Sequence, residues 1–248
     1  MDLRTHIQAV DDEGRRLADS IVDFDAGVPT CPGWTVRDLL RHMGEVHAWA
    51  RSHITDMRQE RNNDVSILRT WPQEDDAALI DWYRDGHIAL VESLEKADPD
   101  AEFYSFLPDW RGTRFWARRQ AHETAIHRVD AESVTGVITP TTAEFAVDGI
   151  EEMLYGFFAR RPSRLVSDPP LSFVLRANDT GQAWSVTIGV DGITTADGET
   201  QGWTSVSGTA FDIYLLLWNR RELDGLAVQG DPAGLGRWRE QAKIYWSF

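Results

Sequence analysis

The chain has 248 residues and a formal net charge of −15, from 40 acidic and 25 basic side chains. Such an excess of negative charge argues against nucleic acid or an anionic membrane as a partner. Because 42% of the residues are hydrophobic and 11 are tryptophan, the chain can form a real core, and a globally disordered protein is excluded.

From the sequence we expect no targeting or membrane-spanning segment. Residues 1–6 lack the apolar core of a secretory signal, and no apolar run approaches the about 20 residues of a transmembrane helix. The one cysteine, Cys31, excludes a disulfide within the chain and fits a reducing compartment. We therefore expect a cytoplasmic protein with no membrane partner, and the absence of an obvious exposed apolar stripe favours a monomer.

The first 162 residues are predicted to be helical. Apolar positions recur there near a period of 3.6, and segments rich in Gly, Pro and Asn interrupt them. Thr35 and Asp38 form a pattern typical of a capped helix start. The predicted helices span residues 3–22, 35–61, 73–97, 113–135 and 140–161.

After Pro162 the period changes to that of strands. Strands are predicted over residues 171–177, 183–189 and 204–208, with turn signals between them. A helix is predicted over residues 209–221 and another short one near the end of the chain. The fold class is therefore α+β, with a helical bundle in residues 1–162 and a small α+β domain in residues 163–248.

Glu123 and His127 stand out on the predicted helix over residues 113–135. They are four residues apart, so on a helix they share one face and could bind one divalent metal. The run is H-E-x-x-x-H and not the H-E-x-x-H of zincins, because Ile126 occupies the second histidine position. The alternative is an ordinary solvated pair, which is common at this spacing.

A metal held by Glu123 and His127 needs a third ligand. His42 and His47 both lie on otherwise apolar lines of the second predicted helix, so each is expected to face inward, and the pattern does not choose between them. His87 and His122 are expected in the core, whereas His6 and His53 are expected at the periphery.

Three segments resemble one protein family. Residues 28–42, with the sequence VPTCPGWTVRDLLRH, and residues 121–132, with the sequence AHETAIHRVDAE, resemble the two signatures of the mycothiol-dependent maleylpyruvate isomerase family of actinobacteria. Residues 208–220, followed by the Gly-Asp-Pro of residues 230–232, resemble its C-terminal domain. The resemblance implies a DinB-like four-helix bundle followed by a small α/β sterol-carrier-like domain.

The resemblance also implies site residues. It places the zinc ligands of the family on His42, Glu123 and His127, and an active-site arginine on Arg220, with Arg221 as the alternative. This ligand set also suits nickel or iron. Asp130, three residues after His127, could accept a hydrogen bond from that imidazole, or could be a surface carboxylate.

The function implied by the resemblance is activation of a small-molecule thiol, mycothiol, at the metal. The thiolate would then add to an electrophilic substrate, either in cis–trans isomerisation of a maleylpyruvate-like acid or in S-transfer. Cys31 is expected to be a small buried hydrophobe, not the nucleophile. The alternatives are a non-catalytic metal- or ligand-binding protein and a metal-assisted hydrolase.

Overall fold

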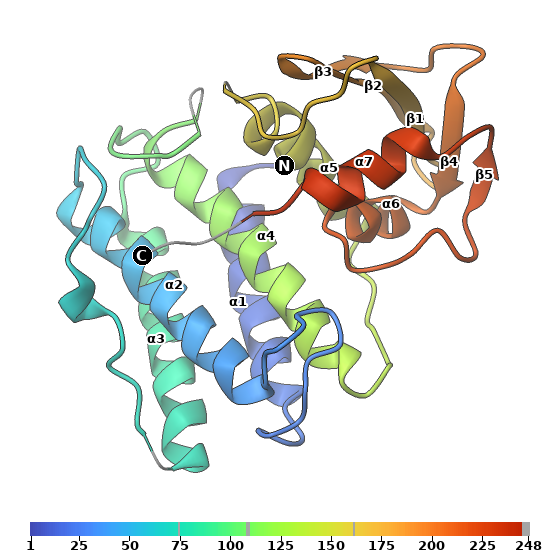
Figure 1. The fold of residues 1–248 in the computed structure, drawn as a ribbon. Coiled ribbons are helices and arrows are strands. Elements are labelled where there is room, and N and C mark those ends of the chain that lie inside the picture. Colours follow the sequence, from blue (N-terminus) through green and yellow to red (C-terminus); the bar gives the residue numbers. More distant parts are fainter. Residues whose placement is uncertain (74, 108–109, 161, 245–248) are drawn as a thin grey trace. The chain divides into compact units, whose positions relative to one another are not determined.

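The computed structural model describes residues 1–73, 75–107, 110–160 and 162–244 (Figure 1). The chain forms two compact units, one from Met1 to Thr139 and one from Pro140 onward. The first is a bundle of four helices and the second is a mixed sheet with helices, so the predicted α+β class with an N-terminal four-helix bundle is confirmed.

Four long helices build the N-terminal unit. These are α1 (Leu3–Asp19), α2 (Val36–Asp56), α3 (Asp76–Lys96) and α4 (Gly112–Ser133), with a short 3₁₀ turn, η1 (Val65–Ile67), between α2 and α3. Helix α4 packs against α1 and α2, and α3 packs against the same two helices. Apart from Arg114, every residue of α4 from Gly112 to Glu132 is buried.

Local chemistry sets where these helices begin. The Asp2 and Asp75 side chains accept hydrogen bonds from the first-turn amides of α1 and α3. At α2, Thr35 and Asp38 form the predicted capping box, in which each side chain binds the other's backbone amide. Gly112 opens α4 with φ +63°, and a Cβ there would lie 1.6 Å from the carbonyl oxygen of Ala101, so only glycine fits.

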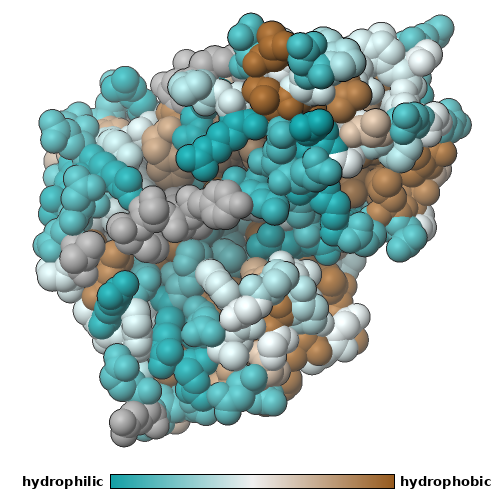
Figure 2. All heavy atoms as spheres, in the orientation of Figure 1, coloured by the Kyte–Doolittle hydropathy of each residue, from teal (hydrophilic) through white to brown (hydrophobic). Residues whose placement is uncertain are grey.

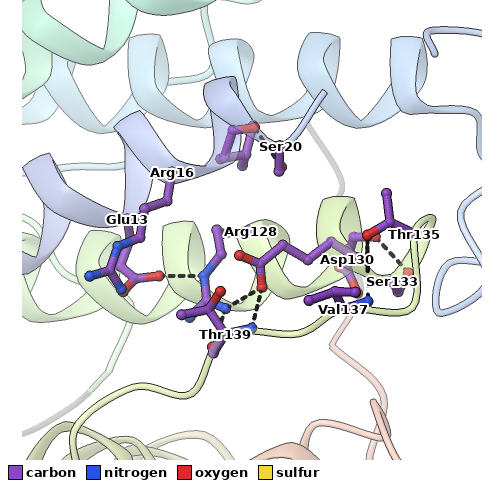
Figure 3. A network of polar contacts seen from close by, with 11 residues as sticks. Glu13, Arg16, Ser20, Arg128, Asp130, Ser133, Thr135, Val137 and Thr139 are labelled. Atoms are coloured by element: carbon purple, nitrogen blue, oxygen red, sulfur yellow. Dashed lines mark hydrogen bonds and ion pairs between the residues drawn. The ribbon is translucent and has the colours of Figure 1, made fainter. Parts of the chain in front are cut away.

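A buried arginine ties α4 to its neighbours. Figure 3 shows Arg128 between Glu13 of α1 and the backbone at Thr139. Its Nε donates to Glu13 at 2.6 Å, and its Nη1 donates to Glu132 at 2.7 Å and to the Thr139 carbonyl at 2.5 Å. Because the Arg128 charge is met by two carboxylates, its burial is compensated, and the ion pairs hold α4 against α1.

A five-stranded sheet is the centre of the C-terminal unit. Its order is β3-β2-β1-β4-β5, with β1 and β4 parallel and the other neighbours antiparallel. The hairpin between β1 and β2 pairs Leu171 with Ile188 and Ala177 with Gln182. The strands are β1 (Leu171–Ala177), β2 (Gln182–Gly189), β3 (Gly192–Asp197), β4 (Thr204–Gly208) and β5 (Ala227–Gln229).

Helices complete this second unit. Helix α5 (Ala143–Glu151) continues into a π-helical turn, η2 (Glu152–Phe157), and packs against α6 (Ala210–Leu217). Helices α6 and α7 (Ala233–Gln241) both contact β1. A second capping box, formed by Thr209 and Asp212, starts α6.

Several predicted boundaries differ from the structure. Helix α2 ends at Asp56 and not near residue 61, because Met57 adopts a left-handed conformation and the following chain folds back, with the Asn62 amide donating to Nε2 of His53. Strands β3 and β5 were not predicted. The predicted end of the fifth helix at Arg161 lies outside the described residues, and the helical hydrogen bonding ends at Phe157.

The two units meet at a different point of the chain from the predicted boundary after residue 162. Helix α5 belongs to the second unit because it packs against α6.

Hydrophilic residues cover much of the face shown in Figure 2. Among the described helices, none combines the length and apolar character needed to cross a lipid bilayer.

Candidate metal centre

Helices α2 and α4 bring His42, Glu123 and His127 together. Their candidate ligand atoms all lie within 4.8 Å of one another. Oε1 of Glu123 is 3.7 Å from Nε2 of His42 and 3.4 Å from Nε2 of His127. The Glu123 side chain is 1% exposed and those of His42 and His127 are 11% and 8% exposed, so the solvated-pair alternative does not describe this site.

Two polar atoms of these side chains make no hydrogen bond. Nε2 of His42 and Oε1 of Glu123 are buried and have no hydrogen-bond partner among the residues that the structure describes. Buried polar atoms rarely remain so unless an ion, water or ligand binds them. With metal bonds of about 2.0–2.1 Å, tetrahedral geometry separates neighbouring ligand atoms by about 3.3 Å, close to the observed 3.4 and 3.7 Å. The residues present therefore fit a divalent metal.

Asp130 fixes the orientation of His127. Nδ1 of His127 donates to Oδ2 of Asp130 at 2.8 Å, so the Nδ1 atom carries the proton. In neutral His127, Nε2 then has a lone pair directed toward Glu123, as a metal ligand requires. The structure thus gives Asp130 a buried role beside the imidazole and not a place on the surface.

The loop before α2 holds Asp130 in place. Oγ1 of Thr30 donates to Oδ1 of Asp130 at 2.6 Å, and Sγ of Cys31 donates to Oδ2 at 3.2 Å. Cys31 is half-buried and packs against the core of the bundle, so the predicted hydrophobic burial is partial, and its thiol also contacts a carboxylate. Trp34, from the same loop, stacks on His127 at an interplanar angle of 12° and meets His42 edge-on.

Cys31, His127 and Asp130 form a second set of close candidate ligands. Their contacts are explained without a metal, because His127 and Cys31 both donate to the Asp130 carboxylate. Nε2 of His42 and Oε1 of Glu123 have no such explanation. This difference favours the set of His42, Glu123 and His127 as the metal position.

The other oxygen of Glu123 binds an arginine. Nη2 of Arg119, one helical turn earlier on α4, donates to Oε2 of Glu123 at 2.9 Å. Both side chains are buried, with exposures of 0% and 1%. Arg119 therefore leaves Oε1 directed toward the two histidines.

The charged neighbours change the protonation of the site. Burial raises the pKa of Glu123, but the imidazoles of His127 and His42 and the Arg119 guanidinium outweigh it and hold that pKa well below its usual value. Burial lowers the pKa of His42. For His127, burial also lowers the pKa, but Asp130 and Glu123 reverse the effect and raise it. The Glu123 carboxylate is therefore ionised, as a metal ligand must be.

The remaining histidines lie in other environments. His47 is fully buried, and its Nε2 lies 3.1 Å from Oγ1 of Thr124, so it faces α4 one turn away from the ligands. His87 and His122 are in the core, as predicted. The prediction that His6 and His53 are peripheral is wrong, because both are buried and His53 stacks between Tyr104 and Trp116.

Arg220 lies in the C-terminal unit, just after α6. Asn219 has φ +58°, and the amides of Asn219 and Arg220 donate to the carbonyls of Leu216 and Leu215, which is the hydrogen-bond pattern of a Schellman helix end. Arg221 binds the Asp212 carboxylate and the Asp224 carbonyl, so this neighbour is held within the unit. Nη1 of Arg220 donates to the carbonyl of Trp218 at 3.0 Å.

Comparisons with known proteins cover both units. The family model described as the mycothiol maleylpyruvate isomerase N-terminal domain matches residues 4–132, and the model of the corresponding C-terminal domain matches residues 144–237. No curated protein matches the chain.

Two solved structures are similar over almost the whole chain. A crystal structure of the mycothiol-dependent maleylpyruvate isomerase has a TM-score of 0.63 and 14% sequence identity, covering 92% of this chain and 93% of that chain. A His-to-Ala mutant of that isomerase has a TM-score of 0.62 and 13% identity, with the same coverage. At these identities the likeness is one of fold.

Proposed function

We propose that this chain, which belongs to the mycothiol maleylpyruvate isomerase family, is a metal-dependent enzyme that activates the thiol mycothiol for addition to an electrophile. The observation that carries the proposal is the convergence of two imidazoles and one carboxylate on a point where buried Nε2 and Oε1 atoms have no hydrogen-bond partner in the described residues. Zinc, nickel and iron all suit two histidines and one carboxylate.

The protein side chains would have defined roles. His42, Glu123 and His127 would hold the metal, and Asp130 keeps the proton on Nδ1 of His127. A bound divalent metal with an open position would stabilise a thiolate over the thiol. Trp34 stacks on His127 and meets His42 edge-on, and its ring would limit the access of water to the site.

Two reactions can follow from one thiolate. In the isomerase reaction, the thiolate sulfur adds to one carbon of a cis double bond, and the electron pair moves onto the conjugated carbonyl as an enolate. The resulting single bond rotates, the thiolate leaves and the double bond re-forms as trans. In the transferase reaction, the adduct takes up a proton and is released. Arg220 is our proposed partner for a substrate carboxylate, because a guanidinium can bind both carboxylate oxygens.

The proposal is tested by metal content and thiol binding together. Elemental analysis and calorimetry with mycothiol are carried out on the wild type, on His127→Ala and on His47→Gln. In the wild type we expect about one metal per chain and thiol binding. In His127→Ala we expect loss of both, because a metal held only by one histidine and one carboxylate is bound weakly. His47→Gln is the matched control, since His47 is also a buried histidine but lies on α2 and contacts Thr124.

Each outcome decides the proposal. Metal and thiol binding that persist in His127→Ala would contradict the assigned ligands. A metal-loaded wild type that does not bind mycothiol but hydrolyses ester substrates would support the hydrolase alternative. A metal-free wild type that binds neither metal nor thiol would favour a non-catalytic binding protein.

A further inference from the structure

Gln120 is a fully buried amide on α4 that makes no side-chain hydrogen bond. Its exposed fraction is 0%, and neither its Nε2 nor its Oε1 has a hydrogen-bond partner among the residues that the structure describes. Because both atoms are unpaired, exchanging the amide nitrogen and oxygen would not change this. A buried amide without partners is unfavourable, and such groups in protein cores are usually bound by water or a ligand.

The neighbours of Gln120 on α4 place it beside the proposed metal position. One turn earlier, Trp116 packs edge-on against Trp49 of α2. One turn later, Glu123 lies against His42 of α2. Residues three and four apart share one face of a helix, with about 5–6 Å between their Cβ atoms. Gln120 therefore lies on the side of α4 that faces α2, one turn from a proposed metal ligand.

A metal alone does not account for Gln120. A divalent metal would explain why Nε2 of His42 and Oε1 of Glu123 have no hydrogen-bond partner in the described part of the chain. The Nε2 group of Gln120 is a hydrogen-bond donor and cannot bind a cation. The contact of Thr124 with His47, at 3.1 Å, does not include Gln120 either. The amide therefore indicates a second polar group next to the metal.

The amide also restricts the chemistry of that group. Gln120 offers N–H donors on Nε2 and an acceptor on Oε1. A carboxylate only accepts and an ammonium only donates, so either would leave one end of Gln120 unpaired. A ligand amide has one N–H and one C=O, so it can pair with both ends at once.

We propose that Gln120 is a specificity-determining residue that binds an amide of the small-molecule thiol. The metal centre would then prefer thiols with an amide two carbons from the sulfur, as in N-acylated cysteine and cysteamine. This inference rests on the proposed function, because the same metal centre would hold the sulfur. Gln120 lies one helical turn from Glu123, and the two-carbon spacer of such a thiol has a length of the same order. Gln120 thus recognises a part of the ligand that the metal does not contact.

The experiment measures the binding of two thiols to the cobalt-loaded protein. Visible spectra of bound Co²⁺ are recorded during titration with N-acetylcysteamine and, separately, with 2-ethoxyethanethiol, which has the same chain length but no amide. The affinity ratio of the two thiols is compared between the wild type and Gln120→Met. We expect the ratio to fall by about tenfold in Gln120→Met, the effect of losing a buried hydrogen bond, with cobalt retained.

Thr124→Val is the matched control for the thiol titrations. It removes another buried polar group from α4 beside Glu123, but the partner of Thr124 is His47 of α2. The affinity ratio of the two thiols should therefore stay at the wild-type value in this variant.

Thermal unfolding of the metal-free proteins gives a second readout. Gln120→Met and Gln120→Leu replace an unpaired buried amide by an apolar side chain, so we expect a Tm equal to or higher than that of the wild type. A lower Tm in both variants would show that the amide stabilises the fold without a ligand, which overturns the inference. Measuring two apolar variants identifies a packing defect that is specific to one side chain.

The outcomes separate this inference from the proposed function. An affinity ratio that does not change in Gln120→Met overturns the role of Gln120 and leaves the thiol chemistry in place. A ratio that falls equally in Thr124→Val reflects a general loss of packing and also overturns that role. A cobalt-loaded wild type that binds neither thiol contradicts the proposed function, and the inference with it.

Discussion

Asp130 connects the proposed metal ligand His127 to the loop that precedes α2. Its carboxylate accepts from His127, Thr30 and Cys31. We expect Asp130→Asn to lower metal affinity by about ten- to hundredfold, because an amide does not hold the Nδ1 proton of His127 as firmly. Competition with a coloured chelator measures the change. Thr30→Val removes one of the three donors and should have a smaller effect, and an Asp130→Asn affinity equal to that of the wild type would show that the contact does not orient the ligand.

His87 gives a prediction about pH at the same scale. Burial lowers its pKa, although the Val10 carbonyl partly opposes this, so the folded state keeps the imidazole neutral where the unfolded state binds a proton. The neutral His87 therefore contributes fully to the free energy of unfolding above the unfolded pKa of about 6.5. As the pH falls below that value, the contribution decreases by up to about 1.4 kcal/mol per pH unit for one proton. Urea unfolding at pH 8, 6.5 and 5.5 should show a shallower decline in His87→Gln than in the wild type. Parallel curves would exclude His87 as a source of acid sensitivity.

Helix α2 depends on its capping box at the element scale. Thr35 and Asp38 satisfy each other's backbone amides about two turns and one turn, respectively, before His42. Thr35→Ala should lower the free energy of unfolding by about 1 kcal/mol and weaken metal binding slightly, because the helix start also anchors the loop that holds Asp130. Thr209→Ala, in the equivalent box of α6, is the control: it should cost similar stability without any effect on metal affinity. Chemical unfolding of both variants measures the loss of stability, and metal titration measures the change in metal affinity.

The same elements show what the sequence can predict. The helical period and the capping signals located α1 to α4, and the four-residue spacing identified Glu123 and His127 as a pair. The pattern could not choose between His42 and His47, because both face α4 and only the packing of the two helices places His42 beside Glu123 and His47 beside Thr124. The family resemblance made that choice.

Other features depend on contacts between distant parts of the chain. Cys31 and Asp130 are 99 positions apart, and no local period connects them. Arg119 belongs to a charged run on α4 that is usual for a solvated face, and only the folded structure shows that it is buried and donates to Glu123. Strands β3 and β5 form because β2 and β4 present edges to them, so their short sequences alone gave too little signal.

At the scale of the whole molecule, the last prediction concerns Arg220, the arginine of the C-terminal unit that the family resemblance assigns to the reaction. If Arg220 binds the substrate carboxylate, Arg220→Met should lower kcat/KM for a carboxylate electrophile by about tenfold or more, the effect of losing a charged hydrogen bond. Metal content and mycothiol affinity should not change in this variant, because the proposed metal ligands all lie in the N-terminal unit and mycothiol is proposed to bind at the metal. Arg221→Met should instead lose about 1 kcal/mol or less of stability, since its pair with Asp212 is partly exposed, and keep its activity. The reverse pattern would assign the active-site role to Arg221, whereas full activity in both variants would remove the C-terminal unit's arginines from the reaction.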